Sequence, residues 1–210
     1  MKSTSMNYLK GRKNMKSILI KLGYYGEIFN YVTKKICGIW FSFIGTIIII
    51  ATIFGYKLCM NPFIFGIGYS IGFYLCYGNK KYVFNRLASG VETSFQKKMS
   101  DNALLILSIL CGVFGGICWL THQSIRNIWL SLLIATAIHF FAFYFVHGKS
   151  VVILGILCLL YGALGFIFPT ISFIYIAFLD GITKIIIGVV MFFQKPSNNE
   201  NSFYRKLFSL

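Results

Sequence analysis

Long apolar runs alternate with short polar segments between residues 36 and 193. A helix needs about 20 mostly apolar residues to cross the hydrocarbon core of a bilayer. Helix-stop and helix-start sequences separate the runs, as at Asn61-Pro62, Gly78-Asn79 and Pro169-Thr170. The pattern predicts an all-α, polytopic integral membrane bundle of six transmembrane helices, at residues 36–55, 62–78, 102–121, 127–146, 151–168 and 171–193.

Residues 1–35 form a basic arm ahead of the first run, and residues 194–210 form a polar tail. Apolar residues recur in the arm at helical spacing, at Ile18, Leu22, Tyr25, Phe29 and Val32. A basic helix with an apolar stripe tends to lie in the membrane interface, so the arm is predicted to be an amphipathic interfacial helix. The alternative is a tail without structure, because glycines weaken the helix. No cleavable signal is expected.

Composition supports a membrane protein, since 57% of the residues are hydrophobic and only 12% are charged. The formal net charge of +15 can indicate nucleic acid binding. Here the positive residues lie before and between the apolar runs, which favours the lipid bilayer and anionic lipid headgroups as partners over nucleic acid. The six cysteines form no CxxC pair and no Cys/His cluster, so no metal, other cofactor or disulfide framework is expected.

The positive residues also predict an orientation. With six spans and a cytoplasmic N-terminus, the inner segments hold seventeen of the 20 Lys and Arg residues, and the outer turns hold only Lys57 and Arg126. This distribution follows the positive-inside rule. Both termini are therefore predicted to be cytoplasmic, with the chain in the cell membrane, as in many small bacterial multi-pass proteins.

Small residues recur on single faces of several predicted helices. Helices in lipid associate through such residues because their backbones can approach closely, although glycine is in any case frequent in membrane helices. Helix packing is therefore predicted at Ser108, Gly112 and Gly116 in the third span, Gly155, Cys158 and Gly162 in the fifth, and Gly181 and Gly188 in the sixth. A homo-oligomer or a membrane partner is also compatible with the sequence.

Two charged residues interrupt the last apolar run. Placing Asp180 or Lys184 at the centre of a span costs about 2.5 to 3.5 kcal/mol on insertion scales. They stand four residues apart, one turn along the same helix face, so they can form an ion pair. One interpretation is a self-neutralising pair that fixes the rotation of the helix. The other is a polar intramembrane centre that responds to protons or ions, with His139 at a similar depth as a relay or ligand.

Three functions follow from these residues. The first is transport of a small solute, or of an ion or proton, through the centre formed by Asp180, Lys184 and His139. The second is a non-catalytic scaffold that binds anionic lipid or a partner through the basic arm. The third is an intramembrane enzyme that uses Ser108 or Thr183. The sequence contains no HExxH or GxSxG motif, so no catalytic activity is expected. A water-accessible cavity reaching Asp180 would favour transport, whereas a dry, tightly packed centre with a closed Asp180–Lys184 pair would favour the structural interpretation.

Overall fold

The chain is helical throughout its core in the computed structural model, which describes residues 17–27, 29, 31–78, 81 and 83–194. The all-α prediction is confirmed, because no strand occurs among these residues. The main helices are α2 (Lys34–Ile53), α3 (Pro62–Phe73), α5 (Ser94–Leu120), α6 (Ile125–Ala142), α8 (Lys149–Ile167) and α9 (Phe173–Phe193), with the single turns α4 (Phe84–Leu87) and α7 (Tyr144–His147) between them.

Five of these helices, α2, α5, α6, α8 and α9, are long and apolar enough to cross a membrane. The protein is thus a membrane-embedded helical bundle. The second predicted span differs from the others, because α3 has only 12 residues, about 18 Å at 1.5 Å per residue. The π-helix Tyr74–Gly78 prolongs it by 5 residues. The sixth crossing, through α3 and this π-helix, remains a prediction.

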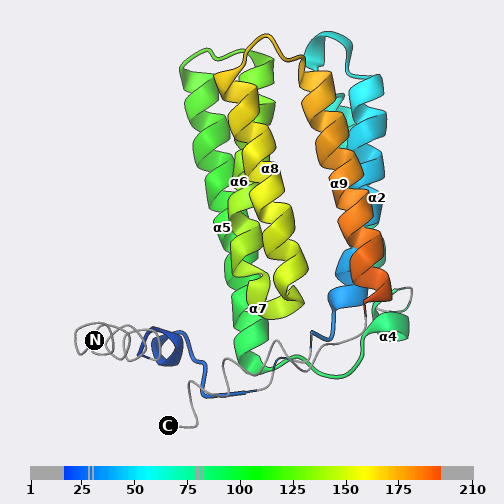
Figure 1. Ribbon diagram of the computed structural model, residues 1–210, viewed down its shortest axis with the longest axis vertical. Coiled ribbons are helices and arrows are strands. Elements are labelled where there is room, and N and C mark those ends of the chain that lie inside the picture. Colours follow the sequence, from blue (N-terminus) through cyan, green and yellow to red (C-terminus); the bar gives the residue numbers. More distant parts are fainter. Residues whose placement is uncertain (1–16, 28, 30, 79–80, 82, 195–210) are drawn as a thin grey trace, which may run out of the picture.

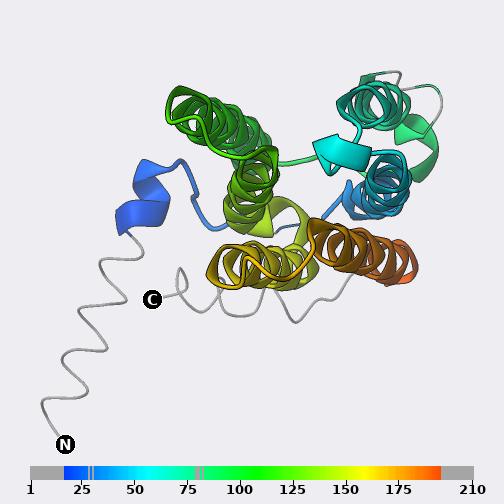
Figure 2. The same cartoon turned by 90° about the horizontal axis from the view of Figure 1, so that it is seen from above.

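The main helices run up and down in alternation (Figure 1). Seen along the bundle, α5, α6 and α8 form one group, and α2, α3 and α9 form the other (Figure 2). Packing of α8 against α9 joins the groups, and α9 packs along the whole of α2. Consequently α2 begins and α9 ends at the same end of the bundle.

That end, here called the basic end, gathers most of the positive residues of the described part of the chain. Lys57 and Arg126 lie at the opposite end. Helices α2, α5 and α8 begin at the basic end, and α4 lies there (Figure 1), which places there Lys34, Lys35, Arg86, Lys97, Lys98 and Lys149. Such an asymmetry is what the positive-inside rule describes.

The helix starts have local causes. Asn61 accepts hydrogen bonds from the backbone N–H groups of Phe63 and Ile64, and Pro62 occupies the first helical position of α3. Helix α5 begins at Ser94, eight residues before the predicted start at 102, because Thr93 and Gln96 form a capping box. The buried Gln96 side chain also donates from Nε2 to the carbonyl oxygen of Phe145, at 3.1 Å.

The predicted interfacial helix in the arm is not found in the described residues. The chain is helical only over residues 17–21 and then turns, because Gly23 and Gly26 both adopt a φ of +93°, which a helix excludes. Tyr24 and Phe29 are buried against Phe95 of α5 instead of facing lipid. Residues 1–16 of the arm, and residues 195–210 of the predicted tail, lie outside the described residues.

Backbone contact between glycines holds α2 against α9. A Cβ built on Gly188 would lie 2.5 Å from the carbonyl oxygen of Gly38, and one on Gly181 would lie 2.8 Å from that of Gly45. On α8, Gly155 and Gly162 lie against α6, where a Cβ on Gly162 would approach Ile134 to 2.6 Å. At these positions glycine permits the close approach of two helices.

The predicted packing face of α5 is different. A Cβ on Gly112 or Gly116 would meet nothing within 4 Å, and the exposed Ser108 hydroxyl donates to Leu104 of its own helix. The seam expected at Ser108, Gly112 and Gly116 is therefore not used between the described helices. The sequence pattern identifies a helix face of small residues, but only the placement of α5 at the edge of the bundle decides whether that face has a neighbour.

Candidate functional site

The two charged residues of α9 form a closed pair inside the bundle. Asp180 and Lys184 are each only 3% exposed, and the ammonium group of Lys184 donates to Oδ1 of Asp180. Their separation of four residues places both side chains on one face of α9. That face also carries Gly181 and Gly188, so the pair is turned toward the other helices and away from lipid.

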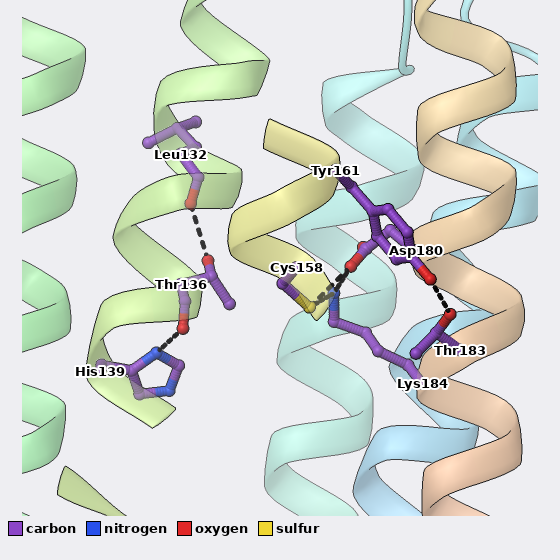
Figure 3. A network of polar contacts seen from close by, with 8 residues as sticks. All are labelled: Leu132, Thr136, His139, Cys158, Tyr161, Asp180, Thr183 and Lys184. Carbon is purple, nitrogen blue, oxygen red and sulfur yellow. Dashed lines mark hydrogen bonds and ion pairs between the residues drawn. The ribbon is translucent and has the colours of Figure 1, made fainter. Parts of the chain in front are cut away.

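Helix α8 adds a thiol to the pair (Figure 3). The Cys158 Sγ donates to Oδ1 of Asp180 at 3.1 Å and accepts from Nζ of Lys184 at 3.8 Å. Sequence reasoning places Cys158 only in the small-residue seam of the fifth span. Its thiol role depends on the rotation of α8 against α9, which spacing along one helix does not give.

A second polar contact lies beside the pair. The hydroxyl groups of Tyr161 on α8 and Thr183 on α9 are 2.9 Å apart. Thr183, a candidate nucleophile by residue type, therefore has a hydroxyl partner. Ser108, the other candidate, is exposed on α5 and bonded to Leu104 of its own helix.

His139 stands on α6 and is not hydrogen-bonded to the pair. Its Nδ1 contacts the carbonyl oxygen of Thr136, and its ring lies against Phe140 and Phe143, with centroids 4.4 and 5.4 Å away. Since a carbonyl only accepts hydrogen bonds, this contact assigns the proton of a neutral imidazole to Nδ1. Figure 3 shows the ring on the side of α6 that faces Cys158, at about the level of Lys184.

A cavity joins the three predicted residues. It has a volume of about 420 Å³, and its walls include Asp180, Lys184 and His139. The rest of the wall is mainly aromatic and aliphatic, with Trp40, Phe41, Ile44, Ile48, Phe65, Tyr69, Trp129 and Phe140 among its residues. The structure thus brings the predicted residues to one space, although only two of them touch.

A smaller cavity of about 190 Å³ lies on the basic side of the first. The two share part of their walls, including Trp40, Tyr69 and His139. The smaller cavity is bounded by Glu92 and His147 near the basic end. His139 therefore stands where the two cavities adjoin.

Most of the chain matches a known protein family. A model of a family of unknown function, DUF6609, matches residues 25–201. The chain belongs to the DUF6609 family. No curated protein and no solved structure matches it. The matched DUF6609 segment contains every helix from α2 to α9 and thus the whole site.

Just beyond the span α6 of this DUF6609 chain, His147 is a buried histidine. Its Nδ1 has no hydrogen-bond partner among the residues that the structure describes, and its ring centroid lies 5.3 Å from that of Phe143. Burial, and then the positive charge of Lys34, lower the pKa of His147 to about 3. The imidazole is therefore neutral at physiological pH.

At the end opposite the basic end, side chains of α6 donate hydrogen bonds to backbone carbonyl oxygens. Arg126 donates from Nη2 to the carbonyl oxygens of Gly165 and Ile171, at 2.6 and 3.2 Å. Trp129 donates from its indole nitrogen to the carbonyl oxygen of Leu58, at 2.9 Å. These bonds connect the α8–α9 turn and the α2–α3 turn to α6. Arg126, one of the two positive residues predicted in the outer turns, thus connects α6 to the α8–α9 turn.

No metal centre is evident in the part of the chain that the structure describes. Within it, no group of three or more His, Cys, Asp and Glu side chains could hold a metal ion. The chemistry offered by the site is thus a buried carboxylate, an ammonium group, a thiol and an imidazole around an apolar cavity.

Proposed function

We propose that this protein moves a small solute through the bilayer, with Asp180, Lys184 and His139 as the polar wall of the solute path and the basic end in the cytoplasm, where it meets anionic headgroups. In this mechanism Asp180 is the protonatable group, Lys184 is its counter-ion, and His139 relays a proton or contacts the solute.

One observation carries the proposal. The three ionisable groups selected from the sequence border a single cavity of about 420 Å³ inside the bundle, although they come from α6 and α9. A pair that served only to fix helix rotation would need no such space beside it. Ionisable residues within membrane segments mark ion and substrate pathways because burying them is costly.

The test is proton movement into liposomes that hold the purified protein and a pH-sensitive dye, driven by a potassium diffusion potential. Wild-type protein is expected to acidify the lumen faster than liposomes without protein. Asp180→Asn is expected to reduce that rate at least tenfold, because it removes the group that binds the proton.

A second variant separates loss of function from loss of folding. Asp180→Asn alone leaves the Lys184 ammonium buried without a counter-charge, which costs about 3–5 kcal/mol. The double variant Asp180→Asn with Lys184→Met keeps the site neutral, so it is expected to retain a wild-type melting temperature while remaining inactive. Wild-type flux in a folded double variant would remove the pair from the mechanism.

A further inference from the structure

Resting on the function proposed above, we infer that the large cavity is a binding site for a neutral, hydroxyl-bearing amphiphile that enters from the bilayer between α3 and α5. The polar wall takes the hydroxyl group and the aromatic wall takes the apolar chain. This inference names the chemical class of the solute and its route.

The boundary of the large cavity indicates the route. Its wall includes Gly66 and Ser70 of α3 and, across from them, Leu107 and Cys111 of α5. Gly66 and Ser70 are exposed, and a Cβ on Gly66 would meet nothing within 4 Å. Helix α3 packs on α2, whereas α5 packs on α6. The side of the cavity between α3 and α5 therefore faces the acyl chains of lipid.

The hydrogen-bonding capacity of the polar wall matches a hydroxyl group. An ammonium group has three N–H donors. Among the residues that the structure describes, those of Lys184 have two partners, Asp180 and Cys158, so one donor remains. Since Nδ1 of His139 donates to Thr136, its neutral ring keeps Nε2 as an acceptor. That atom has no hydrogen bond to any residue that the structure describes. A hydroxyl group matches this set, because it both donates and accepts.

The charges in the cavity wall favour a neutral ligand. The carboxylate of Asp180 and the ammonium of Lys184 already neutralise each other. A carboxylate or amine ligand would bring an extra charge into an apolar cavity with no counter-charge left, and such burial costs several kcal/mol. The site therefore selects against fatty acids and alkyl amines, and a neutral head is the one it can accommodate.

The size and the lining of the cavity suit an apolar chain with a polar head. A volume of about 420 Å³ falls within the usual range for small-molecule sites, about 300–1,000 Å³. Aromatic and aliphatic walls suit an apolar chain, and the few polar groups fix the orientation of the head.

The experiment is photolabelling of the full-length protein in phosphatidylcholine nanodiscs. The probe is 1-hexadecanol carrying a diazirine in its chain, and labelled peptides are identified by mass spectrometry. Label is expected on cavity residues such as Phe65, Leu107 and Cys111. A tenfold excess of 1-hexadecanol should remove most of it, whereas palmitate and hexadecylamine should compete at least fivefold less well.

Two glycines provide matched variants. Gly66→Trp is expected to fill the opening between α3 and α5 and to reduce cavity labelling at least fivefold. Gly112→Trp places the same side chain on α5, where a Cβ also has open space. Gly112 does not border the cavity, so this variant should be labelled like the wild type.

Equal labelling of the two variants, or label confined to lipid-facing residues, would overturn the inference. Equal competition by palmitate would overturn the assignment of a neutral head. The result is independent of the flux measurement. Cavity labelling without proton flux would leave a binding site and reject proton movement through Asp180, whereas proton flux without cavity labelling would keep that movement and overturn the inference.

Discussion

Asp180 shows how much a single residue can specify in this chain. A carboxylate in an apolar run needs a counter-charge, and the residue one turn away, Lys184, is the one that sequence spacing selects. The same reasoning gives only part of the surroundings of His139. Its partner is the Thr136 carbonyl on its own helix, and not Asp180, because α6 does not bring the ring within hydrogen-bond reach of α9.

At the residue scale, His147 makes the stability of the protein depend on pH. Its pKa is lowered from 6.5 to about 3 by burial and Lys34, so between these values the unfolded chain binds more protons than the folded one. The contribution of neutral His147 to the free energy of unfolding is fully present above about pH 6.5. It is lost as the pH falls toward 3, by up to about 1.4 kcal/mol per pH unit.

The measurement is the melting temperature in detergent between pH 7.5 and pH 4.5. His147→Phe keeps an aromatic ring against Phe143 and removes the titration, so its melting temperature should fall less steeply on acidification. His122→Phe alters an exposed histidine and should behave like the wild type. If His147→Phe and the wild type lose stability in parallel, His147 does not cause the dependence.

At the scale of the element, the same small residue has different consequences on different helices. Gly188 on α9 lies against the backbone of α2, whereas Gly116 on α5 has open space where its Cβ would stand. Both were predicted as packing positions from spacing alone. A spacing rule gives the face of a helix, and the neighbour of that face comes from how the helices assemble.

Two alanine substitutions test this difference. Gly188→Ala would place a Cβ 2.5 Å from the carbonyl oxygen of Gly38, so it is expected to destabilise the protein by about 1–3 kcal/mol through overpacking. Gly116→Ala is expected to be neutral or to stabilise by up to about 1 kcal/mol, because alanine favours a helix over glycine. Thermal unfolding in detergent measures both, and equal effects would contradict the packing described for α9.

For the whole molecule, the number of crossings decides which side each end occupies. Five helices satisfy the length of a span, and an odd number of crossings would separate the start of α2 from the end of α9. In the structure these lie at one end of the bundle, and α3 with the following π-helix supplies the return. We therefore expect this shorter segment to cross the membrane, with local thinning or tilting of neighbouring lipid to match its length.

Cysteine accessibility tests the expectation. In a chain whose native cysteines are replaced by serine or alanine, Lys57→Cys should react with a membrane-impermeant maleimide only from outside the cell, and Lys97→Cys only after the cytoplasmic face is exposed. Lys149→Cys is separated from Lys97 by the two helices α5 and α6, so it should react from the same side as Lys97→Cys. Reaction of both Lys57→Cys and Lys97→Cys from one side would mean that α3 does not cross.

The sequence by itself determined the helices, their approximate limits and the burial of an ion pair, because long apolar runs, caps and a pair at i and i+4 act locally along the chain. The helix predicted in the arm is too long, because Phe29 and Val32 are buried within the protein and do not face lipid.

Only the tertiary structure decided that Cys158 joins the pair, that His139 borders the same cavity, and that Gly112 faces open space. Each of these depends on the rotation and position of one helix relative to another. In a bundle those relations are set by packing of all helices at once, so no single stretch of sequence contains them.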